Sequence, residues 1–179
     1  MIEGERIRLR PLQDTDWSLI ESWGQQRAIL WGDYQRFQLD HLPLLRQAYQ
    51  KTGLLSRESA FLLIETQEGA VIGFVRYTLM PFPDEDFPHP EIGFSITDTA
   101  VRGQGYAREA VELLVAYLFA GYSAMRITAV TDAENVPAQR VLTRTGFLHE
   151  GTLRQSTFRD GSWRDLQIYG LLRQNHSST

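Results

Sequence analysis

The stretch that decides most about this chain is Arg102-Gly103-Gln104-Gly105-Tyr106-Ala107, which stands between an expected strand and a strongly apolar helix. Its two glycines remove side chains from a turn, so backbone N–H groups there can converge on an anion. The helix N-terminus behind the turn adds a partial positive charge, and Arg102 adds a full one. Together these groups can hold a pyrophosphate without a metal.

Three other patterns fit this part of the chain poorly. A Walker loop ends in Gly-Lys-Ser/Thr, but the only lysine, Lys51, lies elsewhere. A Gly-x-Gly-x-x-Gly dinucleotide pattern needs glycine at position 108, where Arg108 stands. Gly93-Phe94-Ser95 is similar to the start of a serine-hydrolase nucleophile turn, but Thr97 replaces its last glycine.

The rest of the chain predicts one mixed α/β domain. Alternating polar and apolar residues indicate strands, while apolar residues three and four apart indicate helices. Asn135 is a favoured helix cap, and Gly146 suits the left-handed position just past a helix end. Strands are expected over 6–10, 60–65, 71–79, 91–96, 125–130, 147–158 and 163–172, and helices after Asp14, over 42–49, over 107–121 and after Asn135.

A second motif follows the glycine-rich turn by about 30 residues and makes the pattern specific. Arg102, Gly105 and Ala107 meet the Arg/Gln-x-x-Gly-x-Gly/Ala loop of the GNAT acyltransferases, and the later motif is Asn135-x-x-Ala138, Val141-Leu142 and Gly146-Phe147. The stretch Glu91-Ile92-Gly93-Phe94 and the tail from Glu150 to Tyr169 resemble the RimJ/RimL branch of that family. The resemblance covers essentially the whole chain, from Ile7 onward, as one domain over 1–179 with a flexible tail at 173–179.

The resemblance implies a GNAT fold and an acetyl transfer. The fold would be a mixed, mostly antiparallel sheet of about six or seven strands, with helices on both faces. A bulge would splay the central strand pair and make room for coenzyme A. The activity would be an acetyl-CoA-dependent N-acetyltransferase that moves an acetyl group directly to a primary amine within a ternary complex. Members of the branch acetylate protein N-termini, small amines or antibiotics, so the acceptor stays open.

The resemblance also assigns roles to particular residues. The backbone of Phe94, Ser95 and Ile96 would pair with the pantetheine arm as an added strand. The loop Arg102, Gly103, Gln104, Gly105, Tyr106 and Ala107 would hold the pyrophosphate. Asn135 would contact the pantetheine or its thioester end while capping its helix, and capping alone is the alternative.

Aminolysis of a thioester needs a base, an oxyanion donor and a proton for the departing thiolate. A backbone N–H at Phe94 or Ser95 is the expected oxyanion donor. Glu91 is the first candidate for the base, although it could equally be a structural carboxylate, and His89 and Asp132 follow. Many family members carry a tyrosine as general acid where this chain has Leu142, so water or the Ser95 hydroxyl would protonate the thiolate.

Composition bounds the remaining possibilities. The 179-residue chain has no cysteine, which excludes disulfides, thiolate nucleophiles and cysteine metal sites. Its net charge of −4 gives no global attraction to nucleic acid or anionic membrane. No signal peptide and no apolar run of roughly 20 residues stands out, so a cytoplasmic protein is expected.

Several surface features leave alternatives open. The acidic run Asp84-Glu85-Asp86 is either a solvated loop or an attractor for a cationic amine. Trp31, Tyr34 and Phe37 are either packing residues or part of a substrate cleft. Arg154, Arg159 and Arg164 form a solvated strand face, or meet the 3′-phosphate of coenzyme A or a partner subunit.

Two other functions compete with the enzyme. A catalytically silent acyl-CoA-binding module would have the same loop and would explain the missing tyrosine. A nucleotide-binding protein would bind ATP or NAD more tightly than coenzyme A. A homodimer through the C-terminal strands is expected in either case.

Overall fold

A computed structural model describes residues 1–25, 41–81 and 84–176 of the chain. One eight-stranded sheet runs through these residues in the order β1-β2-β3-β4-β5-β6-β8-β7. Every neighbouring pair is antiparallel except β5 and β6, which are parallel. The strands are β1 (Ile2–Glu3), β2 (Ile7–Pro11), β3 (Ser59–Thr66), β4 (Val71–Met80), β5 (His89–Ile96), β6 (Arg126–Asp132), β7 (Leu148–Arg159) and β8 (Ser162–Leu172).

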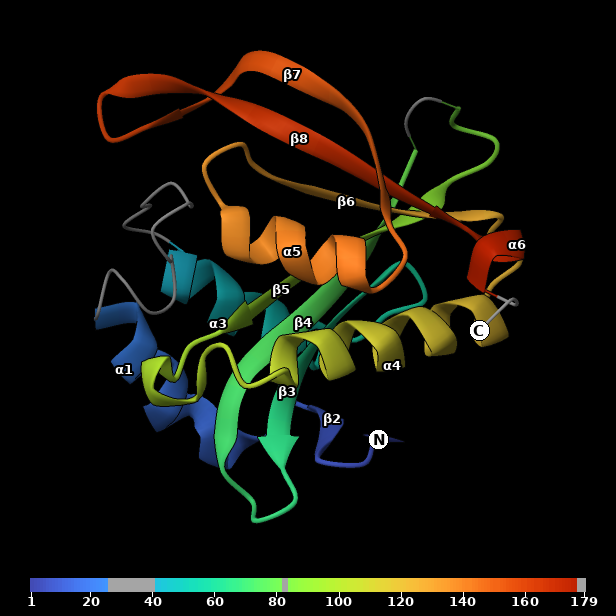
Figure 1. The fold of residues 1–179 in the computed structure, drawn as a ribbon. Coiled ribbons are helices and arrows are strands. Elements are labelled where there is room, and N and C mark those ends of the chain that lie inside the picture. The colour runs from blue at the N-terminus through green and yellow to red at the C-terminus, as the bar shows by residue number, and fades with distance from the viewer. Residues whose placement is uncertain (26–40, 82–83, 177–179) are drawn as a thin grey trace.

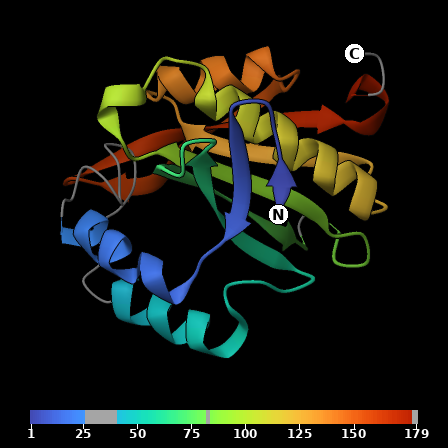
Figure 2. The same ribbon diagram turned by 90° about the horizontal axis from the view of Figure 1, so that it is seen from below.

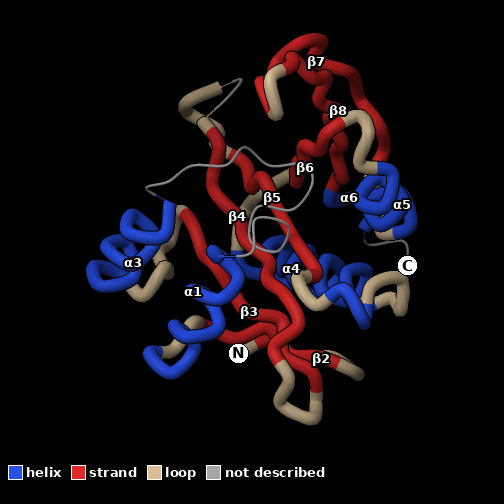
Figure 3. Tube along the Cα trace, turned by 90° about the vertical axis from the view of Figure 1, so that its left-hand side faces the viewer, coloured by secondary structure: helices blue, strands red, loops and turns tan. Residues whose placement is uncertain are grey.

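Helices cover both faces of this sheet, as Figures 1 and 2 show. On one face lie α4 (Tyr106–Gly121) and α5 (Val136–Arg144), and on the other lie α1 (Trp17–Gln25) and α3 (His41–Thr52). Figure 3 shows the same arrangement from the side, with α1 and α3 on the left and α5 on the right of the central strands. No helix among the described residues is long and apolar enough to cross a membrane.

Two apolar clusters fill the spaces between sheet and helices. The cluster under α4 includes Ile64, Val75 and Leu114, whereas the cluster under α1 and α3 includes Leu63 and Phe74. Side chains of neighbouring strand residues point to opposite faces, which explains this division. The face of any residue on β4 and β5 therefore follows from its position in the ladder.

Local sequence explains how the principal turns form. Asn135 caps α5, with its side-chain oxygen accepting from the Ala138 N–H at 3.2 Å. Gly146 has φ +88° just past the end of α5, as expected for a left-handed residue there. Asp160 (φ +49°) and Gly161 (φ +79°) form the tight turn between β7 and β8.

Two expectations about the fold need correction. The sheet has eight strands instead of six or seven, because Ile2 and Glu3 pair with Leu9 and Arg8. The expected flexible tail begins instead with a helical turn, α6 (Arg173–His176). The Arg173 guanidinium fixes it by donating to the backbone carbonyls of Phe119, Tyr122 and Ala124 at 2.5–2.8 Å.

Candidate active site

The parallel strands β5 and β6 separate part-way along their length. They pair at Glu91 with Thr128 and at Ile92 with Ala129, yet β5 continues to Ile96 and β6 to Asp132. We call the unpaired part, Gly93–Ile96 facing residues 130–132, the β5–β6 divergence, and Figure 1 shows the two ribbons parting there. The β4–β5 ladder keeps one register throughout, so the expected bulge is absent from that ladder.

Backbone groups of β5 point into this divergence. The Thr97 N–H donates to the Ile72 carbonyl at 2.9 Å, and hydrogen-bonded pairs alternate along an antiparallel ladder. The Ser95 N–H is therefore directed at β4, while the N–H groups of Phe94 and Ile96 face the divergence. Of the two expected oxyanion donors, this register favours Phe94 over Ser95.

The glycine-rich loop lies at the same end of the sheet. Because β5 and β6 are parallel, their C-terminal ends share one edge, which brings Arg102–Ala107 and Asn135 together. Gly103 and Gly105 have φ of +78° and +92°, a region that favours glycine. Among the described residues, the N–H groups of Gly103, Gln104 and Gly105 have no hydrogen-bond acceptor, so they are available to an anion at the start of α4.

Two arginines hold the loop in shape. The Arg102 Nε donates to the Ile96 carbonyl at 3.0 Å, so its charge is tied to the end of β5. Arg6 donates to the Gln104 carbonyl at 2.8 Å and lies over the Tyr106 ring, 4.1 Å from its centre. Arg6 could not be predicted as part of the loop from the sequence, because no local pattern links residues that are 98 positions apart.

The face opposite α4 carries the candidate chemistry. Ser95 stands across from Phe74, which packs in the cluster under α1 and α3, so Ser95 and Glu91 share that face. Both are half-buried, and neither side chain has a hydrogen-bond partner among the described residues. Burial raises the pKa of the Glu91 carboxyl, and the charge of Arg76 opposes that shift only in part. A carboxylate with a raised pKa in this position could accept a proton from an incoming amine.

The other two candidates for the base differ from Glu91. Burial and the charge of Arg126 lower the pKa of His89, although Glu150 opposes this. Asp132 forms a buried ion pair with Arg159 at 2.5 Å, and their side chains are 1% and 6% exposed. We therefore exclude Asp132 as the base, because its carboxylate is engaged in fixing the chain.

The ion pair of Asp132 also corrects one reading of the C-terminal arginines. Arg159 is buried, and Arg164 donates to Glu134 at 2.6 Å, so these two do not form a solvated strand face. Instead they attach the β7–β8 hairpin to the turn between β6 and α5. That turn also includes a Glu134 N–H bond to Asp132 at 2.8 Å, and it ends at Asn135.

The remaining expected residues fall outside this constellation. Leu142 is 1% exposed and packs in the core under α4, so no hydroxyl stands in the place of the family's tyrosine. The acidic residues 84–86 lie exposed on the loop before β5. Trp31, Tyr34 and Phe37 lie outside the described residues.

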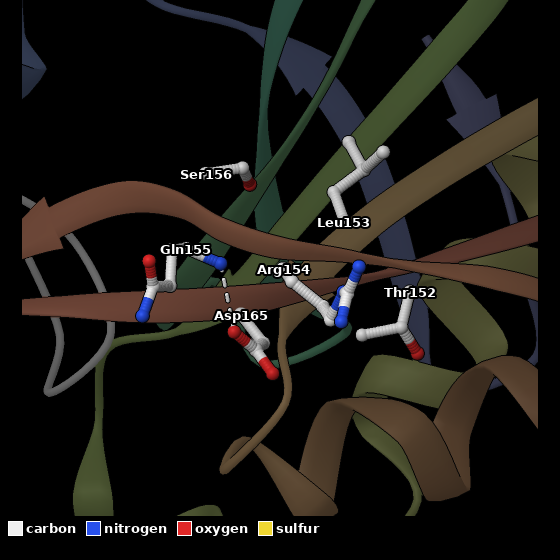
Figure 4. A pocket seen from close by; sticks show the side chains of 6 residues that line it. All are labelled: Thr152, Leu153, Arg154, Gln155, Ser156 and Asp165. Carbon is white, nitrogen blue, oxygen red and sulfur yellow. Dashed lines mark hydrogen bonds between the residues drawn. The ribbon is translucent and has the colours of Figure 1, made fainter.

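A separate hollow lies on the β7–β8 hairpin, where β7 leaves the ladder between Leu153 and Thr157 (Figure 4). Gln155 has φ +49° there, and its N–H donates to the Asp165 carboxylate at 2.8 Å. The hollow is formed by exposed side chains of the hairpin and the half-buried Asp165. It contains Arg154, one of the C-terminal arginines singled out in the sequence, but none of the candidate catalytic or coenzyme A-binding residues. Its lining comprises Thr152, Leu153, Arg154, Gln155, Ser156 and Asp165.

Comparison with known proteins identifies the class to which this site belongs. Residues 6–148 match the family described as acetyltransferase (GNAT) domain. The chain is 26% identical over 176 residues to the uncharacterised N-acetyltransferase p20 of Bacillus licheniformis, covering 97% of this chain and 96% of that protein. It is 28% identical to the probable N-acetyltransferase YjcK of Bacillus subtilis, covering 96% and 97%. The chain belongs to the GNAT acetyltransferase family and is an N-acetyltransferase.

Solved structures show the same fold. Ribosomal-protein-S5-alanine acetyltransferase from Vibrio fischeri superimposes with a TM-score of 0.76 at 20% identity, covering 97% of this chain and 96% of that one. Spermidine N-acetyltransferase from Vibrio cholerae, solved with coenzyme A and spermine, gives a TM-score of 0.80 at 20% identity, covering 98% and 100%. At this identity the likeness concerns the fold alone.

Proposed function

We propose that this chain transfers an acetyl group from acetyl-CoA to a primary amine by direct attack at the β5–β6 divergence. One observation carries the proposal. The N–H of Phe94, the acceptor-free N–H groups of the glycine-rich loop and the carboxylate of Glu91 lie around one end of a parallel strand pair. These groups match the three parts of a thioester donor and its amine: carbonyl, pyrophosphate and ammonium.

The donor fits this site through backbone groups. The free N–H groups of Gly103, Gln104 and Gly105 would hold the pyrophosphate. The Ile96 N–H would pair with the pantetheine, and the Phe94 N–H would face its thioester end. Acetyl-CoA supplies the acetyl group as a thioester whose thiolate can depart. α4 and α5 cover the face of the sheet on which the glycine-rich loop leads into α4. The acceptor would therefore approach from the opposite face of the sheet, which carries Glu91.

The chain's own groups would then manage charge and protons. Glu91 would take a proton from the ammonium, directly or through water, so that the amine nitrogen can bond to the carbonyl carbon. The Phe94 N–H would donate to the carbonyl oxygen as negative charge develops there. When the carbon–sulfur bond breaks, water or the Ser95 hydroxyl would give the thiolate its proton. Positioning supplies much of the rate because the thiolate is a good leaving group.

The test is an acetylation assay read by mass spectrometry. The protein is incubated with acetyl-CoA and a panel of N-terminal peptides, polyamines, amino acids and aminoglycosides. We expect one class of acceptor to gain an acetyl mass, and Gly105→Glu to abolish the gain. Tight binding of coenzyme A without any product would instead support the catalytically silent module.

The finer placement of the protein is also a proposal. We place it in the RimJ/RimL-like branch and in the cytoplasm. The likeness to the S5-alanine acetyltransferase supports the branch, although identity is only 20%. The acceptor of that neighbour is not carried over to this chain, because side chains that the fold does not specify decide which acceptor binds.

A homodimer through the β7–β8 hairpin completes the proposal. β7 is an edge strand, and the hairpin exposes Leu148, Leu153, Phe158 and Trp163, the last at 61%. Phe158 and Trp163 stack edge-to-face across the strands with ring centres 5.5 Å apart. Exposed apolar side chains on an edge strand favour association with a second copy. Light scattering should give a dimer mass, and Trp163→Glu should give the monomer; a monomeric wild type would contradict the proposal.

A further inference from the structure

Arg76 places a positive charge at the mouth of the β5–β6 divergence. It stands across the β4–β5 ladder from Gly93, the first residue of β5 beyond the last β5–β6 pair. A Cβ atom at Gly93 would lie 2.9 Å from the Arg76 Nε and 3.3 Å from its Cζ. The guanidinium therefore extends across the Gly93 backbone, in space that any side chain at position 93 would take.

Glu91 places a negative charge beside it on the same face. Arg76 faces Gly93 in the β4–β5 ladder, and Glu91 is two residues before Gly93 on the same face of the sheet. Two residues along a strand correspond to about 7 Å. Burial raises the pKa of the Glu91 carboxyl, and the charge of Arg76 offsets only part of that rise. The candidate base thus has a cation next to it, on the side from which the acceptor would come.

Arg76 forms no direct contact with a carboxylate within the described part of the chain, although Glu91 lies near it. Its side chain is exposed and forms neither an ion pair nor a hydrogen bond there. Most other strand arginines are engaged with acids, which makes Arg76 a cation available to a ligand. The engaged pairs are Arg8 and Arg10 with Glu65, Arg126 with Glu150, Arg159 with Asp132, and Arg164 with Glu134.

A neighbouring cation and anion fit a molecule that carries both charges close together. We propose that the acceptor is an amine with a nearby carboxylate, such as a free α-amino acid, whose carboxylate binds the Arg76 guanidinium while its amine faces Glu91. This inference rests on the proposed function and narrows its substrate class. A polyamine carries no carboxylate, and repulsion from Arg76 would disfavour it at this position.

With such an acceptor, the bonds and protons change as in the transfer described above. The amine loses one proton to Glu91, the carbon–nitrogen bond forms, the carbon–sulfur bond breaks, and the thiolate receives a proton. Arg76 takes no part in these bond changes. It acts as a specificity-determining residue by binding the carboxylate through charge-assisted hydrogen bonds.

The experiment compares amino acids with their carboxamides as acceptors. Specificity constants for each acid and its amide are measured for the wild type, Arg76→Gln, Arg76→Lys and the control Arg57→Gln, which removes an exposed charge elsewhere. Rates are taken where they no longer rise with pH. We expect the wild type to prefer the acid, and Arg76→Gln to lose about ten- to a hundredfold on the acid only. Arg76→Lys should recover part of the loss, and Arg57→Gln should match the wild type.

The remaining outcomes separate this inference from the proposed function. Equal losses on acid and amide in Arg76→Gln would overturn the inference, since a structural role lowers both. Turnover confined to polyamines or long peptides would overturn it while leaving the acetyltransferase intact. No product from any acceptor would overturn both, and calorimetry with coenzyme A would then show whether the donor site exists.

Discussion

Among single residues, Glu91 matters most for the proposed transfer, which depends on how its carboxyl group ionises. Burial raises its pKa, so the charged form is less stable in the folded chain than in water. The same carboxylate must be charged to accept a proton. Activity and stability therefore place opposite demands on this side chain, which is common for catalytic groups.

Replacing Glu91 with Gln should separate these demands. We expect kcat to fall about a hundredfold or more, with coenzyme A binding unchanged. In the wild type, kcat/KM should decline on the acid side around a pKa above the ordinary 4.5, because protonation removes the base. The variant should lose that decline and melt at a slightly higher temperature, since a buried charge is gone. A small loss of kcat with the same pH profile would show that Glu91 is structural.

Gly105 tests the phosphate loop at the same scale. Its φ of +92° suits glycine, and an alanine there costs about 1 kcal/mol of strain or moves the loop. We expect Gly105→Ala to weaken coenzyme A binding about tenfold by calorimetry. Gly121→Ala is the matched control, because Gly121 has no neighbouring atom within 4 Å of the added carbon and no positive φ. Equal affinities for the two variants would argue against this loop as the pyrophosphate site.

At the scale of elements, the β7–β8 hairpin is attached to the β6–α5 turn by the buried Arg159–Asp132 pair. Asp132→Asn removes the buried carboxylate from the Arg159 guanidinium, which retains longer contacts to the more exposed Glu134 and Asp160. The free energy of unfolding should fall by about 3 kcal/mol in a denaturant titration. Because Asp132 is not the base in this account, kcat at saturating coenzyme A should fall far less than in Glu91→Gln. A hundredfold loss of kcat at unchanged stability would restore Asp132 as a candidate base.

A second network fixes the first helix to the sheet. Arg10 bonds to Asp16 and to Glu65. Its guanidinium lowers the pKa of the Asp16 carboxyl against the opposing effect of burial. Burial raises the pKa of the Glu65 carboxyl, but Arg10 and Arg8 outweigh burial and leave that pKa lowered. Carboxylates with lowered pKa values stabilise the fold above their ordinary values of 3.8 and 4.5, and this stability is lost as pH falls through the lowered values.

The acid unfolding of an arginine variant checks this network. Wild-type stability should fall steeply below about pH 4.5, and Arg10→Gln should show a shallower fall from a lower starting value. Arg46→Gln is the control, because its partner Glu21 is 48% exposed and such surface pairs contribute little. Parallel stability curves for wild type and Arg10→Gln would contradict the assignment.

For the molecule as a whole, the local features of the fold could be predicted from the sequence. The glycine turn, the cap at Asn135 and the left-handed Gly146 are short-range patterns, so they could be predicted from neighbouring residues alone. The resemblance to a family supplied the strand pair and its separation. The contact of Arg6 with Gln104 escaped prediction because it is long-range, and the strand at Ile2 did so because two residues are too few to show an alternating pattern.

Side-chain pairing explains the remaining differences. From the sequence, Asp132 is a candidate base and Arg159 a solvated cation, because no neighbour along the chain pairs with either one. Only the fold brings the two side chains together. Which N–H of β5 faces the divergence also depends on register, which no local pattern determines. The position of the candidate site could therefore be predicted from the sequence. Which of its residues acts as base, as oxyanion donor or as a structural residue could not.

The most direct test of the central claim is amide hydrogen exchange by NMR, with and without coenzyme A. If the β5–β6 divergence holds the donor, the Phe94 and Ile96 amides should exchange readily in the free protein and become protected when coenzyme A binds. The amides of Gly103 to Gly105 should follow, whereas Ser95, already bonded to β4, should be protected in both states. Binding of coenzyme A that leaves Phe94 and the loop amides unchanged would contradict the account.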